Sequence, residues 1–306
     1  MPVSEPTAPR IIALFGPTGV GKTAIAIALA QLLRKRGEAP VAVSADAMQV
    51  YAGLEILTGV ASAAEQEQLE HRLVSFVALQ ESFSVGRYSE LAHAEIDGLL
   101  ANGRRPILVG GTGLYLRAAL TALDLRPASS QETRERWLAL LERDGSAALH
   151  ATLARRAPWA AARIEPNDRQ RLLRALELLD EGELDPPEGP SQLWSEDLRR
   201  PTLLIGLTME RAALYDRIDR RVDAMIAAGV EDEVRRAHRA GPSATAAKAL
   251  GFGELLDGDA DTVKRRTRNY ARRQLTWMRK LGGVRLLDVT GRDGIQVAEE
   301  ILALDP

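Results

Sequence analysis

The chain has 306 residues, 45% of them hydrophobic and 27% charged, with a formal net charge of −2 and no cysteine. This composition is typical of a globular protein large enough for one α/β domain and a smaller lobe, and it excludes disulfides, thiolate catalysis and cysteine-ligated zinc. Because no apolar run reaches about 18 residues and no secretory pattern is visible, we expect a cytoplasmic protein without a membrane partner.

The first part of the chain alternates apolar runs with helix-like segments. After residues 1–10, which are expected to form a flexible tail, the predicted elements are a strand over Ile11–Phe15, a helix over Ala24–Arg34, a strand over Val41–Ser44, a helix over Tyr88–Leu100 and a strand over Pro106–Val109. Strands that alternate with helices through short loops predict an α/β fold with a doubly wound parallel sheet.

The character of the sequence changes after residue 124. Residues 131–180 have helical spacing and no convincing strand, with a helix expected to start at Asn167-Asp168. A Pro- and Gly-rich break follows at 185–190. The elements expected in this half are helices over Arg169–Leu179, Leu214–Ala228 and Lys264–Leu281, and strands over Thr202–Leu207 and Val284–Val289. We therefore expect an α/β core over 11–124, a mainly helical insertion domain over 125–200, and a return to the core over 201–306.

Between the first strand and the first helix lies a phosphate-loop (P-loop) pattern, Gly16-Pro17-Thr18-Gly19-Val20-Gly21-Lys22-Thr23. Its glycines let backbone N–H groups converge on phosphate oxygens at the positive end of the following helix. Lys22 adds a positive charge, and the Thr23 hydroxyl is placed to hold Mg²⁺. The predicted diphosphate-binding residues are Gly16, Thr18, Gly19, Val20, Gly21, Lys22 and Thr23.

A loop of this kind recognises a diphosphate and does not by itself identify ATP. Hydrolases that use it usually add a carboxylate at the end of another buried strand. Here the strand over Pro106–Val109 runs into Gly110-Gly111-Thr112-Gly113 without an acid, which weakens an ATPase interpretation. Two other functions are compatible with such a loop and sheet: a small-molecule or nucleotide kinase, and a non-catalytic RNA-binding protein that has kept the scaffold.

Further segments resemble those of bacterial tRNA dimethylallyltransferases, and they occur in that family's order. They are Asp46-Ala47-Met48-Gln49-Val50-Tyr51, the run Pro106–Leu116, Arg163-Ile164 with Pro166-Asn167-Asp168, the stretch Arg171–Glu177, Arg221-Val222-Asp223-Ala224-Met225, and Arg273-Gln274-Leu275-Thr276-Trp277. With the phosphate loop, they cover nearly the whole chain. Ala47 stands where the family usually has Ser.

The resemblance implies a reaction in which a dimethylallyl group passes from its diphosphate to the exocyclic N6 amine of the adenosine on the 3′ side of the tRNA anticodon. Diphosphate is released, and Mg²⁺ is the implied cofactor. Asp46 matches the family's catalytic base, and proton transfer to such a base is typically worth about 10²–10⁴ in rate. Thr23 and Arg221 would stabilise the leaving diphosphate, with Arg217 as a weaker candidate. The implied partners are dimethylallyl diphosphate and the tRNA anticodon arm, bound by a monomer.

A second group of residues is expected to contact tRNA. Residues 264–280 contain eight Lys or Arg and no acid, and on a helix Arg268, Arg272 and Arg279 share one face. Uncompensated charges repel each other, and a polyanion relieves the repulsion, although a solvated basic face is the alternative. The predicted tRNA contacts are Asp46, Ala47, Met48, Gln49, Gln170, Arg171, Arg174, Arg268, Arg272, Arg273, Gln274, Trp277 and Arg279. For Gln49, packing is an equally open role, and for Trp277 packing in the core is favoured over stacking on a base.

Overall fold

The computed structural model describes residues 11–126, 128–186 and 192–305 and divides the chain into two compact units. One unit comprises the chain up to Leu123 and from Leu193 onward, and the other comprises Asp124–Gln192. The predicted tail at 1–10 and most of the predicted break at 185–190 lie outside the described residues. No described helix is both long and apolar enough to cross a membrane.

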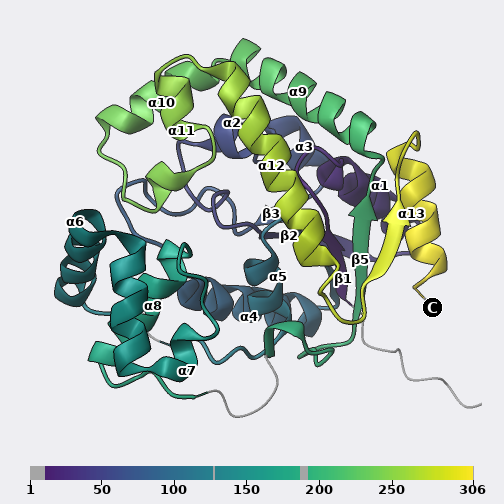
Figure 1. Cartoon of the computed structure of the whole chain (residues 1–306). Helices are drawn as coiled ribbons and strands as arrows, with labels where there is room; N and C mark the ends of the chain where they lie inside the picture. Colours follow the sequence, from purple (N-terminus) through teal and green to yellow (C-terminus); the bar gives the residue numbers. More distant parts are fainter. Residues whose placement is uncertain (1–10, 127, 187–191, 306) are drawn as a thin grey trace, which may run out of the picture. The chain divides into compact units, whose positions relative to one another are not determined.

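In the described part of the first unit, six parallel strands form one sheet in the order β3-β2-β4-β1-β5-β6 (Figure 1). Their bounds are β1 Ile11–Phe15, β2 Ala39–Ala45, β3 His71–Arg72, β4 Arg104–Gly110, β5 Thr202–Thr208 and β6 Arg285–Asp288. The prediction of an α/β fold with a parallel sheet and an inserted helical segment is confirmed. The short β3 has no apolar run, and the sequence did not predict it.

The central strands are long apolar runs because a parallel sheet is covered by helices on both faces. β1, β2, β4 and β5 are almost wholly buried. The helices of this unit are α1 Lys22–Lys35, α2 Glu55–Thr58, α3 Ala63–Gln68, α4 Val85–Ala101, α5 Gly113–Leu120, α9 Arg211–Ala227, α10 Val230–Arg239, α11 Phe252–Leu256, α12 Ala260–Met278 and α13 Gly294–Ala303.

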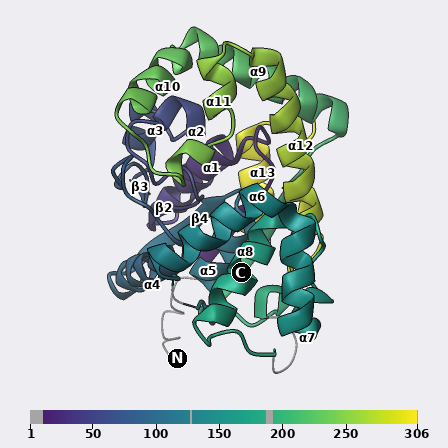
Figure 2. The same cartoon turned by 60° about the vertical axis from the view of Figure 1, so that its left-hand side comes forward.

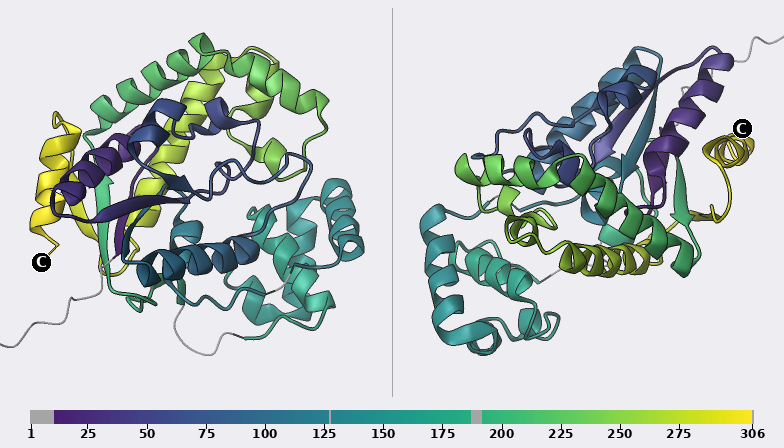
Figure 3. Two further views of the ribbon diagram at one scale, coloured as in Figure 1. Left: turned by 180° about the vertical axis from the view of Figure 1, so that it is seen from behind. Right: turned by 90° about the horizontal axis from the view of Figure 1, so that it is seen from above.

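Two pairs of helices in this unit pack against each other. α9 packs along α12 (Figure 1), and α1 packs beside α13, as the view from behind also shows (Figure 3). α12 begins at Ala260, four residues before the predicted start at Lys264, because the Asp259 side chain accepts the Thr262 N–H at 3.0 Å and caps the helix. It ends at Met278, before the predicted end at Leu281.

The second unit contains α6 (Gln131–Arg156), α7 (Pro158–Ala161) and α8 (Arg169–Asp180) (Figure 2). Asp168 caps α8 by accepting the Arg171 N–H at 3.1 Å, as predicted. The core of this unit consists mainly of Trp137, Leu141, Leu149, Leu153, Leu172, Ala175 and Leu176. Asp180 holds the helices together by accepting hydrogen bonds from Arg136 and Trp137 and by pairing with Arg156.

The second boundary of the insertion differs from the predicted position at residue 200. Residues 193–200 belong to the first unit, where Arg199 and Arg200 both pair with Asp97 of α4, at 2.8 and 2.9 Å. The Arg199 N–H also donates to the Leu120 carbonyl at 2.8 Å. These contacts are remote in sequence, so the local composition of the segment does not reveal them.

Candidate active site

Three neighbouring strands end level with one another at the carboxyl edge of the sheet. β4 lies between β1 and β2, and Gly110 of β4 pairs with Phe15 on one side and Ala45 on the other. The loops that follow these strands therefore start side by side. They carry the phosphate loop, Asp46 and the Gly-rich turn at 110–113, so the main sequence motifs meet where open α/β sheets bind ligands.

The phosphate loop has the backbone conformation that its glycines permit. Gly19 and Gly21 have φ angles of +83° and +103°, which glycine adopts without a steric penalty. Lys22 Nζ donates to the carbonyls of Gly16 and Pro17, at 2.9 and 3.1 Å. In the described residues, the backbone N–H groups of Gly19, Gly21, Lys22 and Thr23 are among those of the loop that have no protein acceptor. Since they stand at the start of α1, they are available to an anion.

Two backbone donors that were predicted to bind diphosphate are used by the protein itself. The Val20 N–H donates to Pro17 O at 3.3 Å, and the Val20 side chain is buried in the core. The Thr18 N–H donates to Gln274 Oε1 at 2.9 Å. The free donors of the loop are therefore concentrated in its second half, around the start of α1.

Lys22 supplies a cation within this cradle. Burial, helped by the charge of Arg221, lowers the pKa of Lys22 to about 8, and the charge of Asp46 opposes this shift. The free protein therefore holds an ammonium group whose charge is costly in the absence of an anion. A bound diphosphate would favour the charged form.

Asp46 lies beyond the end of β2 and is partly buried. Its Oδ1 accepts the Met48 N–H at 2.9 Å and the Gln49 N–H at 3.4 Å, and its Oδ2 accepts the Thr112 hydroxyl at 3.3 Å. The carboxylate thus caps its own turn, as many loop aspartates do, and is also held next to the Gly-rich turn. Both roles fix its position close to the phosphate loop.

Gln49 is committed to the protein through both ends of its amide. Its Oε1 accepts the Ser44 hydroxyl at 2.9 Å, and its Nε2 donates to the Gly59 carbonyl at 3.0 Å. These bonds favour the packing role over a direct tRNA contact. Ala47 and Met48 are partly exposed beside Asp46, and the Ala47 N–H donates to Thr112 Oγ1 at 3.4 Å.

Two arginines of α9 reach the loop region. The Arg221 guanidinium lies against Gly59; burial lowers its pKa, and the charges of Glu65 and Asp46 oppose that shift. Arg217, one turn earlier, lies against Gly21 of the phosphate loop itself, where a Cβ would stand 3.0 Å from its Nη2. The structure therefore places the weaker sequence candidate, Arg217, at least as close to the cradle as Arg221.

The residues at this edge suit Mg²⁺ bound together with a diphosphate. Thr23 opens α1, and in the described residues its hydroxyl has no hydrogen bond to the protein. The described chain has no cluster of three acidic or histidine ligands, so a protein-only metal cage is absent from that part. Because Mg²⁺ commonly keeps waters and uses few protein ligands besides substrate phosphates, a single hydroxyl beside a diphosphate cradle fits this ion.

A family model described as IPP transferase matches residues 49–281 of the chain, which is well over half of it. The chain belongs to the IPP transferase family. The relatives confirm this over nearly the full length. The tRNA dimethylallyltransferase of Kineococcus radiotolerans is 39% identical, covering 99% of this chain and 98% of its own. That of Symbiobacterium thermophilum is 40% identical, covering 96% and 94%.

Solved structures place the fold in the same family. The tRNA isopentenylpyrophosphate transferase of Bacillus halodurans is 36% identical, with a TM-score of 0.69, and the match covers 97% of this chain and 95% of that one. A eukaryotic dimethylallyltransferase described as acting on tRNA has 25% identity and a TM-score of 0.71, over 92% of this chain and 74% of that chain.

In this IPP transferase, three of the eight cations of α12 and its C-terminal extension are compensated, which corrects the prediction that none is. Lys264 pairs with Asp223 at 2.5 Å, Arg266 pairs with Glu254, and Arg268 pairs with Asp219 at 2.6 Å. Two of the acids come from α9, which is distant in sequence, and the third comes from α11, the helix before α12. Arg268 is therefore a weaker candidate for phosphate contact than the sequence suggested.

The remaining cations keep their charge exposed. Arg272, Arg273 and Arg279 are exposed, and none has an acidic partner among the described residues. Arg272 donates to Asn269 Oδ1, at 3.1 Å, and Arg273 lies over the Tyr270 ring at 5.5 Å. By contrast, Ala271 and Met278 of the same helix are buried.

Trp277 and Gln274 face inward. The Trp277 ring lies 4.6 Å from that of Trp194 and 6.3 Å from that of Phe15, measured between ring centroids, and it fills the space beside Gly113. These contacts favour the packing role. Gln274 is only 4% exposed, and its amide accepts one backbone N–H and donates to one backbone carbonyl. Gln274 is therefore a weaker candidate for tRNA contact than the sequence suggested.

In the helical unit, the predicted contacts divide into two kinds. Gln170 and Arg171 are exposed at the start of α8, where Arg171 lies 3.5 Å from Asp168. Arg174 is partly buried and donates to Ser129 Oγ at 2.7 Å and to the Arg126 carbonyl at 3.0 Å. Arg174 thus holds the segment before α6 in place. The sequence did not reveal this structural role, because Ser129 and Arg126 are remote from Arg174 along the chain.

Sequence reasoning missed Tyr270. It stands one turn before Gln274 on α12, and its hydroxyl interacts with Thr112 and Gln274. Burial and the nearby charge of Asp46 raise the pKa of Tyr270 to about 12, against the effect of these interactions. The spacing of four residues from Gln274 is the signal that would have put both side chains on one face.

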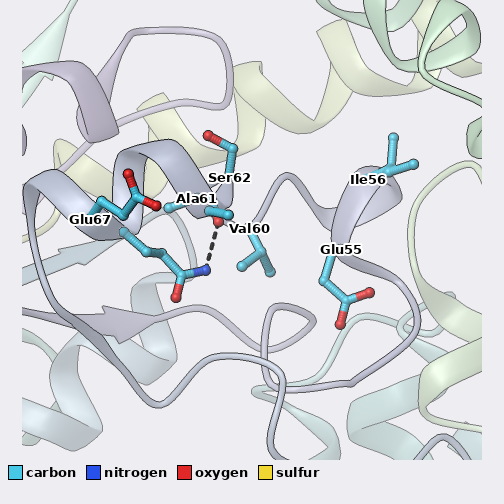
Figure 4. Close-up of a pocket in the computed structure, with 8 residues that line it drawn as sticks. Glu55, Ile56, Val60, Ala61, Ser62 and Glu67 are labelled. Atoms are coloured by element: carbon cyan, nitrogen blue, oxygen red, sulfur yellow. Dashed lines mark hydrogen bonds between the residues drawn. The ribbon is translucent and has the colours of Figure 1, made fainter.

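A separate hollow between α2 and α3 does not suit a polyanion. It is lined by Glu55, Ile56, Val60, Ala61, Ser62, Ala63, Gln66 and Glu67 (Figure 4). The Gln66 amide closes one side by donating to the Ala61 carbonyl at 2.8 Å. Two carboxylates would repel a diphosphate, so the phosphate loop is the better candidate site.

Proposed function

We propose that this protein transfers a dimethylallyl group from dimethylallyl diphosphate to the N6 amine of the adenosine that follows the anticodon in tRNA. The observation that carries the proposal is the level ending of β1, β4 and β2, which brings a diphosphate cradle and Asp46 to one place. Relatives named tRNA dimethylallyltransferase over the whole chain favour this activity over a kinase. Because tRNA is the substrate, we propose a cytoplasmic location, and we propose that the protein acts as a monomer.

Each side chain has a role that its chemistry suits. The adenine amine is a weak nucleophile because its lone pair is delocalised into the ring, and Asp46 takes the N6 proton as the new N–C bond forms. The C–O bond to diphosphate breaks in the same step. The N–H groups of the loop, Lys22, Arg221 and Arg217 bind the developing charge on the diphosphate. Mg²⁺, held through Thr23, would neutralise part of that charge.

The proposed activity is tested by incubating the protein with unmodified tRNA and dimethylallyl diphosphate, followed by digestion and mass spectrometry of the nucleosides. The expected product is one adenosine per tRNA that is heavier by a dimethylallyl group. A parallel reaction with ATP in place of the donor, without RNA, tests the kinase alternative. Phosphorylation of an acceptor with no prenylated adenosine would contradict the proposal.

The exposed arginines at the end of α12 allow a prediction about tRNA binding. We expect Arg272→Gln with Arg279→Gln to weaken tRNA binding and to flatten its dependence on salt. Each lost phosphate contact removes somewhat less than about one unit from the log–log slope, because fewer counterions are released. Equilibrium titrations of tRNA binding at a series of salt concentrations measure this slope.

Arg268→Gln is the matched control, because Asp219 already neutralises Arg268. We expect this variant to change the salt slope less than the double variant does. Donor affinity should stay the same in both. An unchanged slope in the double variant would mean that this face is merely solvated.

A further inference from the structure

Gln274 is a buried polar side chain in an otherwise basic and exposed stretch of α12. It is 4% exposed, whereas its neighbours Arg272 and Arg273 are exposed. A buried amide is costly unless its donor and acceptor are both satisfied. Here backbone groups of two other loops satisfy both, so specific hydrogen bonds at the site compensate for the burial of this side chain.

The Gln274 amide joins the phosphate loop to the Gly-rich turn after β4. Its Oε1 accepts the Thr18 N–H at 2.9 Å, and its Nε2 donates to the Gly111 carbonyl at 2.8 Å. Gly111 has no side chain, and a Cβ there would overlap Nε2. Lys22 Nζ would lie 3.5 Å from that same Cβ. The amide of Gln274 and the ammonium of Lys22 thus approach the same glycine.

This arrangement constrains the first half of the phosphate loop. Because the Thr18 N–H is bound to Gln274, it is not free to turn toward a phosphate. The first half of the loop is tied to the turn at 110–113, and the unpaired N–H groups remain at Gly19 and in Gly21–Thr23. We propose that Gln274 is a positioning residue for the diphosphate site, which holds the loop in the shape that receives two phosphates. The proposal rests on the proposed function, in that the diphosphate is the donor's.

Only a side chain with one acceptor and one donor satisfies both loops. Glutamine has both. Glutamate keeps an acceptor for Thr18 but turns a second, charged oxygen toward the Gly111 carbonyl and into the neighbourhood of the diphosphate. Methionine has a similar length and flexibility but no comparable donor or acceptor. These two replacements therefore separate the loss of the link from the addition of a charge.

The test measures binding of inorganic pyrophosphate by calorimetry in magnesium-containing buffer, for the wild type, Gln274→Met and Gln274→Glu. We expect pyrophosphate affinity to fall at least about 10-fold in the Met variant, since a lost hydrogen bond leaves buried groups unsatisfied, and further in the Glu variant. The KM for the donor should rise more than kcat falls. tRNA affinity should stay close to that of the wild type, because the side chain is buried. Gln68→Met, the same change on the exposed face of α3, should alter none of these values.

Two results would overturn the proposal. One is unchanged pyrophosphate affinity in both variants. The other is a loss of tRNA affinity as large as the loss of pyrophosphate affinity, which would make Gln274 an RNA contact. Thermal unfolding of each variant is recorded alongside, and the nearly isosteric Glu variant serves if the Met variant does not fold. If the wild type makes no prenylated tRNA but the variants still lose pyrophosphate affinity, the proposed function fails and the role of Gln274 stands.

Discussion

Asp46→Asn is expected to lower kcat for prenyl transfer by at least about 10²-fold while leaving the fold and tRNA affinity nearly unchanged, because it removes the general base. The amide oxygen of Asn can still accept the Met48 N–H that Asp46 Oδ1 accepts at 2.9 Å, so the turn after β2 is kept. Single-turnover assays with saturating tRNA and donor measure the chemical step directly.

The control for this variant is Asp257→Asn, an identical change on an exposed residue after α11. It should leave kcat, tRNA affinity and the unfolding temperature as they are in the wild type. Near-normal turnover in Asp46→Asn would remove Asp46 from the catalytic step and leave it only the role of capping its own turn.

Lys22→Ala is expected to weaken the binding of dimethylallyl diphosphate and of pyrophosphate alike, by about 10-fold or more. The loop recognises the diphosphate and not the lipid, and a charge-assisted hydrogen bond is worth about 1.5–3 kcal/mol. tRNA affinity should not change. Competition between pyrophosphate and donor, measured as an inhibition constant for both proteins, checks this. If pyrophosphate inhibits both equally, the donor binds elsewhere.

The lowered pKa of Lys22 gives the same experiment a pH dependence. Since burial brings this pKa to about 8, the ammonium is charged below pH 8 and loses its proton as the pH rises through that value. Pyrophosphate affinity of the wild type should therefore fall above about pH 8. Pyrophosphate itself also titrates, so Lys22→Ala is measured in parallel. Only that part of the fall in pyrophosphate affinity which is absent in this variant is due to Lys22.

The sequence by itself determined the fold class and the centre of the site. The glycines of the phosphate loop permit a backbone shape that other residues adopt only under strain, and apolar runs without polar interruption require a sheet covered on both faces. Both signals are local in the sequence, so they can be recognised without knowledge of the tertiary structure. The same holds for Asp168, which caps α8 from the position that the sequence predicted.

Only the tertiary structure decided which charged and polar side chains face a ligand. Arg268 is paired with Asp219, 49 residues away, and Gln274 bonds Thr18, 256 residues away. Ion pairs and buried hydrogen bonds depend on which helices pack together, and a run of basic residues says nothing about acids that other helices bring to it. For this reason the sequence overestimated the basic face of α12 and did not reveal the hydrogen bond between the Gln274 amide and the phosphate loop.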